Sequence, residues 1–399
     1  MARILDCWEL GNGLAYIEGF AASSKLLAKA GHEMSLAARD LSHAERLFGK
    51  HAKYYQAPTQ VIPVSTPLPA PMTFADVLIN LGFGRPEAVV ARVRAWRNFF
   101  DLVKPDILRF GSAPGAMLAA RGMGIRNMVL GIGFIVPPPV SPLPLLRTWA
   151  KNANPERMAA REAMVLAGMN EGLKAIGAPP LESLGALYAD ADHRVLYTYP
   201  ELDDYGPRPD VKYLGILQAA AGEAPAWPDA PGKRIFVYLE AFKPVEAVLK
   251  GLADIRQPTL VYMPHPPEEW KTKYSSATLR ITNNPVNMLR ATAECDIGVN
   301  HGAHNSVATL LAAGKPQICL PTVFPERITG DKIAALGTGL VSRMETAEFG
   351  SQLAKLLKEP VFTEKARELG QRHAGLTMEA GMKQLLELVG GMIEASPKR

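Results

Sequence analysis

Short apolar segments alternate with amphipathic helical patterns along most of this chain, and this alternation constrains its fold more than any other feature. Ala2 to Trp8 is a short apolar run, and Gly11-Asn12-Gly13 follows it. A helical pattern then extends from Ile17 to Ala30 and stops at Gly31, before a second apolar run from Glu33 to Ala38. A strand, a glycine turn, a helix and a strand in this order predict a parallel sheet covered by helices.

The same alternation continues in two blocks separated by an irregular segment. In the first block it predicts strands at 107–110, 127–131 and 193–198, and helices at 86–103, 116–122 and about 145–177. Residues 219–232 are rich in alanine, proline and glycine without periodicity, which marks a linker. In the second block it predicts strands at 234–239, 259–263, 279–282, 296–300 and 317–320, helices at 243–255, 286–294 and 307–313, and mostly helix from about 331.

Two blocks of this kind predict an α/β protein made of two Rossmann-like domains that face each other across a cleft. The first domain is expected at 1–218, the linker at 219–232 and the second domain at 233–375, with a separate C-terminal helix at 376–399. Ligands of such sheets bind beyond the carboxyl ends of the strands. The residues that follow each strand are therefore the first candidates for a site.

Composition excludes several classes of protein. The chain has 399 residues, 48% of them hydrophobic, and a formal net charge of +5, which suits a globular protein with a large core. Its three cysteines, Cys7, Cys295 and Cys319, lie far apart in apolar runs, which excludes a disulfide scaffold and indicates reduced thiols in the cytoplasm. No apolar run is long enough to span a membrane, and no signal peptide is expected. The basic residues are scattered, so no nucleic-acid partner is expected.

The stretch from Cys295 to Leu340 carries the most chemical information. A strand ends in Asn300-His301, and a turn of small and polar residues, Gly302 to Ser306, opens a helix. The free N–H groups and positive dipole end of a helix N-terminus bind phosphate, and small residues let the phosphate approach the backbone. The alternative is that Ser306 only caps the helix and His301 only fills the turn.

This stretch resembles the donor-binding signature of GT-B-fold glycosyltransferases, in particular the family-one nucleotide-sugar enzymes of bacteria. The residues in register with that signature are Asp296, His301, Gly302, Asn305, Ser306, Gly314, Pro316, Pro321, Gly337 and Gly339. Residues 11–40 and 104–125 resemble the first glycine loop and the acceptor-side segment of the same family. The resemblance implies the GT-B architecture, in which the C-terminal helix at 376–399 crosses back to the first domain.

The resemblance also implies an inverting, metal-independent transfer of a sugar from a nucleotide diphosphate to an unidentified acceptor. The co-substrate would be a UDP- or dTDP-sugar, with no resident cofactor and no metal. Positions that match the donor site of the family are Val286, His301, Gly302, Ala303, His304, Asn305, Ser306, Thr309 and Glu326. Positions on the acceptor side are Gly11, Asn12, Gly13, Ser112 and Phe134.

Some positions depart from the family pattern. Tyr16 stands where many relatives carry the histidine that acts as general base, and a tyrosine with a pKa of about 10 is a poor base at neutral pH. Glu18 is an alternative base. Thr309 replaces a glutamate that holds the ribose, and Pro325-Glu326 replaces the Asp-Gln pair that holds the sugar. Two alternatives therefore stay open: a catalytically silent nucleotide-binding or partner protein, and another GT-B-fold enzyme such as a sugar-nucleotide epimerase.

Overall fold

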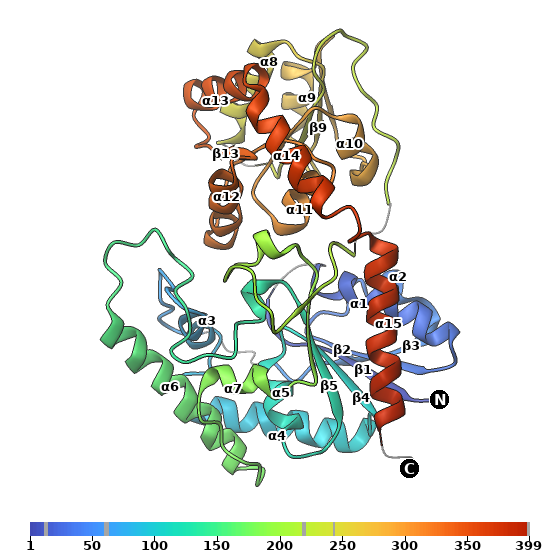
Figure 1. The fold of residues 1–399 in the computed structure, drawn as a ribbon, viewed down its shortest axis with the longest axis vertical. Coiled ribbons are helices and arrows are strands. Elements are labelled where there is room, and N and C mark those ends of the chain that lie inside the picture. The colour runs from blue at the N-terminus through green and yellow to red at the C-terminus, as the bar shows by residue number, and fades with distance from the viewer. Residues whose placement is uncertain (12–14, 60–63, 218–220, 242–243, 397–399) are drawn as a thin grey trace. The chain divides into compact units, whose positions relative to one another are not determined.

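The computed structural model describes residues 1–11, 15–59, 64–217, 221–241 and 244–396. It divides into two compact units, one made of Met1–Leu217 with Met378–Arg399 and the other of Gln218–Thr377 (Figure 1). Each unit contains one parallel sheet with helices on both faces. The prediction of two Rossmann-like α/β domains is thereby confirmed.

The sheet of the first unit has the strand order β3-β2-β1-β4-β5-β6-β7, and all its strand pairs are parallel. Its strands are β1 (Arg3–Trp8), β2 (Glu33–Ala38), β3 (Ala52–Gln56), β4 (Ile107–Gly111), β5 (Arg126–Gly131), β6 (His193–Leu196) and β7 (Lys212–Tyr213). The central strands β1 and β4 are buried almost throughout, which explains why they appear in the sequence as continuous apolar runs. The strand order reverses between β1 and β4, so residues after these two strands meet at one point of the sheet edge.

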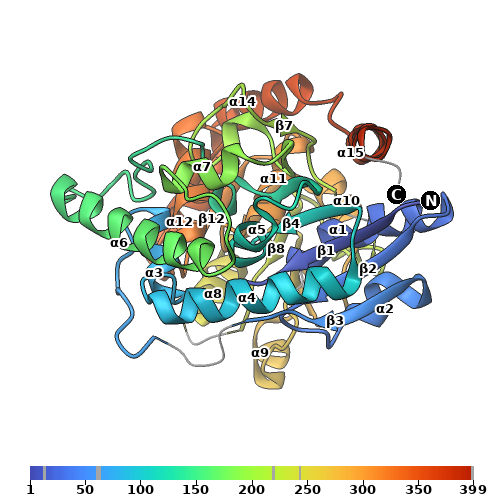
Figure 2. The same ribbon diagram turned by 90° about the horizontal axis from the view of Figure 1, so that it is seen from below.

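Two groups of helices cover opposite faces of this sheet (Figures 1 and 2). The helices before the second unit are α1 (Ala15–Lys29), α2 (Ala44–Phe48), α3 (Phe74–Asn80), α4 (Pro86–Val103), α5 (Pro114–Ala120), α6 (Pro155–Lys174) and α7 (Leu184–Ala189). On one side α1 contacts α2 and the C-terminal helix, and on the other side α4 contacts α5 and α6.

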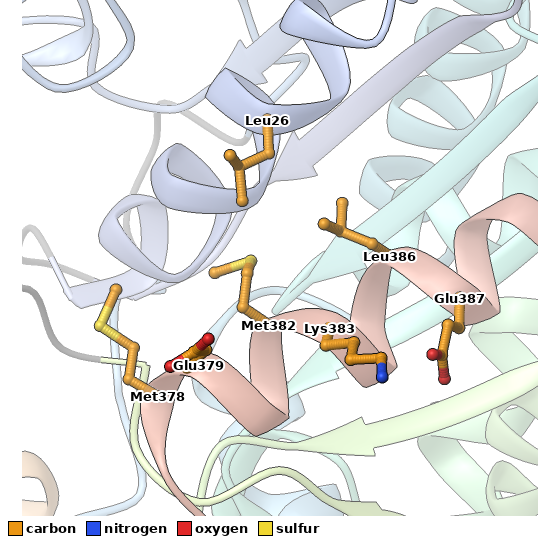
Figure 3. Close-up of a pocket in the computed structure, with 7 residues that line it drawn as sticks. All are labelled: Leu26, Met378, Glu379, Met382, Lys383, Leu386 and Glu387. Atoms are coloured by element: carbon orange, nitrogen blue, oxygen red, sulfur yellow. The ribbon is translucent and has the colours of Figure 1, made fainter.

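The C-terminal helix α15 (Met378–Ala395) follows the second unit in sequence but belongs to the core of the first. Leu385 and Val389 are completely buried there, in one cluster with Leu27 and Leu214. Gly381 lies directly against the backbone of Leu214, where a side chain would not fit. Beside this contact, a groove between α1 and α15 is lined by Leu26, Met378, Glu379, Met382, Lys383, Leu386 and Glu387 (Figure 3).

The sheet of the second unit has the order β10-β9-β8-β11-β12-β13, again with parallel pairs. Its strands are β8 (Ile235–Tyr238), β9 (Thr259–Tyr262), β10 (Leu279–Thr282), β11 (Ile297–Asn300), β12 (Gln317–Cys319) and β13 (Gly339–Val341). Its helices are α8 (Val245–Ile255), α9 (Glu268–Tyr274), α10 (Met288–Glu294), α11 (His304–Ala312), α12 (Phe324–Leu336), α13 (Thr346–Lys358) and α14 (Pro360–Arg372). The strand order reverses between β8 and β11.

Three of the expected segments differ in detail from the structure. The helix expected from residue 145 starts at Pro155, because Asn154 caps it and Pro155 occupies its first turn. The region after 331 is mostly helical, as predicted, and also contains the short strand β13. Part of the expected linker is packed rather than free: the Glu223 N–H donates to the Pro285 carbonyl, and Trp227 packs edge-on against Phe236.

No helix within the described residues is long and apolar enough to cross a membrane.

Candidate functional site

A cavity opens in the second unit at the carboxyl ends of β8, β11 and β12, where the strand order reverses. Its volume is about 380 Å³, within the range of small-molecule sites. The residues that line it are Tyr238, Glu240, His301, Ala303, Ser306, Thr322, Val323 and Glu326. Four of them, His301, Ala303, Ser306 and Glu326, are donor-site residues expected from the sequence.

The turn between β11 and α11 is shaped by Gly302. Its φ of +92° belongs to the left-handed region that favours glycine, and a Cβ there would lie 2.6 Å from the Glu326 carbonyl. The Gly302 N–H donates to Asn300 Oδ1 at 2.7 Å, and Asn300 Nδ2 donates to the buried Gln317 Oε1 at 2.9 Å. The buried side-chain amides of Asn300 and Gln317 therefore hold this turn in place.

The N-terminus of α11 faces this cavity without a side-chain cap. The N-cap residue is Ala303, whose side chain is not polar, so no side chain caps the helix, and its positive dipole end favours an anion. Ser306, in the first turn, is only 6% exposed and lines the cavity. No residue in the described ranges forms a hydrogen bond with its hydroxyl. The chemistry of the helix end therefore favours a negatively charged group such as phosphate.

His301 is a neutral imidazole in this arrangement. The Glu240 N–H donates to His301 Nε2 at 2.6 Å, so Nε2 is an acceptor and the ring proton is on Nδ1. Burial lowers the pKa of His301, although the carboxylates of Glu326 and Glu240 and a backbone hydrogen bond at Leu320 act in the opposite direction. The histidine, the first residue after β11, is thus linked to Glu240, the second residue after β8.

Glu326 is held in place at the start of α12. Its Oε2 accepts from the Thr322 N–H at 2.8 Å, the Thr322 hydroxyl at 2.9 Å and the Val323 N–H at 3.2 Å. These bonds satisfy donors at the helix N-terminus and keep the carboxylate at the wall of the cavity.

The other expected donor residues do not line the cavity. Thr309 is buried, and its hydroxyl donates to the Asn305 carbonyl at 2.7 Å. His304 and Asn305 form the start of α11. Val286 is 6% exposed and packs in a cluster with Phe236 and Leu260.

Four lining residues were not expected from the sequence: Tyr238, Glu240, Thr322 and Val323. Tyr238 and Glu240 lie at and just after the end of β8, and Thr322 and Val323 lie beyond β12. The sequence signal that could have identified them is their position after neighbouring strands, because ligands of such sheets bind there. Tyr238 also stacks on Tyr262, with ring centroids 5.0 Å apart.

The acceptor-side residues lie around the equivalent point of the first unit. Gly11 follows β1 with a φ of +89°, and Ser112 follows β4 with a φ of +50°, an unusual conformation for serine. The Ser112 carbonyl accepts the Leu10 N–H at 2.9 Å, which holds the two loops together. Phe134 follows β5; its N–H donates to Asp204 Oδ2, and its ring meets Phe74 edge-on.

The expected base positions lie at the start of α1. Asn12, Gly13 and the side chain of Tyr16 are outside the described residues. Glu18 is exposed in the first turn of the helix.

Charged side chains on and after β1 and β4 of the first unit are buried and paired with one another or with backbone N–H groups. Asp6 and Arg109 are both completely buried and form two hydrogen bonds, at 2.6 and 2.8 Å, and Arg109 also donates to the hydroxyls of Ser23 and Ser24. Glu9 accepts the Gly115 N–H at 2.8 Å and the Ala116 N–H at 3.3 Å, at the N-terminus of α5.

The Glu9 carboxyl also lies 3.1 Å from Arg92. Burial raises the pKa of Glu9, against the effect of Arg92 and of these N–H groups.

Among the described residues, no group of three or more histidine, cysteine, aspartate or glutamate side chains is arranged to hold a metal ion.

Known proteins similar to this chain are glycosyltransferases. No family model matches the sequence. The elloramycin glycosyltransferase ElmGT of Streptomyces olivaceus is 31% identical over 98 residues, and the match spans 25% of each protein, so only about a quarter of that relative is matched.

Solved structures match over nearly the whole chain. CalG4, the calicheamicin glycosyltransferase, has a TM-score of 0.73 at 16% identity, with 98% of both chains covered. VinC in complex with dTDP has a TM-score of 0.69 at 14% identity, with 98% of this chain and 100% of VinC covered. The spinosyn rhamnosyltransferase SpnG with thymidine diphosphate has a TM-score of 0.63 at 15% identity, with 96% and 100% covered. The chain therefore has the GT-B fold of these glycosyltransferases, as the sequence predicted.

Proposed function

We propose that this protein is a glycosyltransferase that moves a sugar from a nucleoside diphosphate to an acceptor. The observation that carries the proposal is the uncapped N-terminus of α11, with the Ser306 hydroxyl beside it in a cavity at the strand-order reversal. Backbone N–H groups and the hydroxyl of a buried serine that has no partner among the described residues are suited to the oxygens of a diphosphate. The complexes of VinC with dTDP and of SpnG with thymidine diphosphate support a thymidine nucleotide as the donor.

In the proposed reaction, an acceptor oxygen forms a bond to the anomeric carbon while the bond from that carbon to the diphosphate breaks, which inverts the configuration. Negative charge grows on the departing diphosphate. The N-terminus of α11 and Ser306 stabilise that charge without a metal, because they are already oriented before the reaction. The acceptor oxygen loses its proton to a base, for which Tyr16 and Glu18 at the start of α1 are the candidates.

We place the acceptor at the loops after β1, β4 and β5 of the first unit, around Gly11, Ser112 and Phe134. The spinosyn rhamnosyltransferase has been solved with spinosyn aglycone, and CalG4 is named for calicheamicin. These names support a small-molecule acceptor rather than a macromolecule.

Calorimetric titration with dTDP, UDP and GDP tests the donor site. We expect dTDP to bind best and Ser306→Ala to weaken binding by about 10- to 100-fold, the effect of losing a hydrogen bond to a charged group. Ser342→Ala is the matched control, because Ser342 is equally buried in the same unit and its hydroxyl donates to the Arg343 carbonyl away from the cavity.

Two results would contradict the site: no binding of any of the three nucleotides by folded protein, or equal losses in the two serine variants. Turnover in the presence of EDTA and the anomeric configuration of the product then test the absence of a metal and the inversion. Nucleotide binding without transfer to any acceptor would instead favour the catalytically silent alternative.

A further inference from the structure

The charge of the cavity in the second unit is unusual for a site that would receive an anion. Two carboxylates, Glu240 and Glu326, line it, and none of its described lining residues is lysine or arginine. Glu240 is exposed, and its carboxylate makes no hydrogen bond or ion pair within the described part of the chain. Glu326 uses Oε2 for three hydrogen bonds to Thr322 and Val323.

His301 does not compensate for these negative charges. Both carboxylates lie close enough to influence its titration, yet the ring is held neutral, because Nε2 accepts the Glu240 N–H. The same hydrogen bond fixes the backbone of Glu240 beside the end of β11, where Glu240 lines the cavity.

A second observation marks this cavity as a place where a ligand binds. Ser306 is more than nine-tenths buried, lines the cavity and has no hydrogen-bond partner among the described residues. The cavity therefore offers two chemically different regions. The helix N-terminus with Ser306 suits phosphate oxygens, and the carboxylates of Glu240 and Glu326 suit a positively charged group.

We infer that the donor sugar carries a protonated amine, and that Glu240 is the residue that selects it. This inference rests on the proposed function, because it assigns the sugar of the same nucleotide donor. A sugar attached to a diphosphate at the α11 N-terminus extends from the phosphate toward the surrounding wall, where an ammonium group donates to the Glu240 carboxylate. A neutral hydroxyl at the same place makes a weaker hydrogen bond and leaves the negative charge uncompensated.

The negative charge of Glu240 should weaken the binding of a nucleotide without a sugar, whereas it should strengthen the binding of an amino-sugar donor. The Glu240 carboxylate repels the diphosphate of dTDP and attracts the ammonium group of an amino sugar. Removing the carboxylate should therefore move the two affinities in opposite directions, a result that a merely structural role of Glu240 would not produce.

The test measures the Kd of dTDP, of dTDP-glucose and of dTDP-aminohexoses with the amine at C2, C3 or C4. The wild-type protein is expected to bind one of the amino donors at least about tenfold more tightly than dTDP-glucose. In Glu240→Gln this preference should disappear, while dTDP binds about two- to fivefold more tightly. Glu269→Gln is the control: Glu269 is an exposed residue at the start of α9 that does not line the cavity, and the substitution changes the net charge by the same amount.

Three results would overturn the inference: no amino donor is preferred, the preference persists in Glu240→Gln, or Glu269→Gln has the same effect. A wild-type protein that binds dTDP but prefers the neutral sugar refutes the inference and leaves the proposed function intact. A folded protein that binds none of these nucleotides refutes the proposed function, and the inference with it.

Discussion

The position of α15 makes a quantitative prediction about stability. Leu385 is completely buried in the core of the first unit, although it lies beyond the whole second unit in sequence. Replacing it by alanine removes buried methyl groups and leaves a cavity, which costs about 2–5 kcal/mol in such sites. The first unit has about 240 residues, for which a loss of about 3 kcal/mol corresponds to a fall in melting temperature of about 6 °C.

Hydrogen exchange with mass spectrometry can assign this loss to one unit. Leu385→Ala should lower the opening free energy of amides in β1 and β4 and leave those in β8 and β11 unchanged. Leu353→Ala should do the reverse, because Leu353 is equally buried in the core of the second unit. Leu102→Ala controls for the substitution itself, since Leu102 is 75% exposed and its loss should cost less than about 0.5 kcal/mol.

Either of two results would refute the reasoning. If Leu385→Ala weakens β8 and β11 as much as β1 and β4, the helix is not a specific part of the first unit. If it leaves β1 and β4 unchanged, the helix does not contribute to that core at all.

Three further predictions concern single groups. Arg109→Met should lower the free energy of unfolding, measured by urea denaturation, by about 3–5 kcal/mol, because it leaves the Asp6 carboxylate buried without its partner; a loss below 1 kcal/mol would contradict the buried pair. NMR titration should give His301 a pKa below 6.5, and a still lower pKa in Glu326→Gln. Because the unfolded chain takes up the proton first, the free energy of unfolding should fall as the pH drops from 6.5 to the folded-state pKa, a fall that His301→Gln lacks. Gly302→Ala should cost at least about 1–2 kcal/mol from its positive φ and weaken dTDP binding, and unchanged affinity would show that the turn tolerates a side chain.

Local patterns in the sequence account for most of the fold. The buried strands and the helices between them are predictable because each strand is a compact apolar run and each helix has its own periodicity. β3 was missed because its residues, Ala52–Gln56, are half-buried or exposed and therefore form no compact apolar run. β13 was missed because it is only three residues long and lies between two helices.

The candidate site was predictable only in part, for a physical reason. The turn after β11 carries its own signal, a glycine followed by small and polar residues at a helix start. Glu240 carries only the signal of its place after a strand, because its position in the cavity depends on β8 lying next to β11, and the residues joined by the His301 hydrogen bond are 61 positions apart. The charge of the cavity, unlike the phosphate-binding turn, therefore becomes apparent only when the strands are assembled.

The six strands of the second unit follow the same order as the first six strands of the first unit, but the units differ at the helix that starts beyond the reversal of that order. In the first unit the N-terminus of α5 is occupied by the protein itself, because the Glu9 carboxylate accepts the Gly115 and Ala116 N–H groups. This carboxylate occupies the N–H groups and balances the positive dipole end of the helix, so the helix end does not attract an external anion. In the second unit the equivalent helix, α11, has no such carboxylate and no side-chain cap. Among the described residues, this helix therefore offers an anion site in the second unit and not in the first, which agrees with the proposed assignment of the diphosphate to the second unit and of the acceptor to the first.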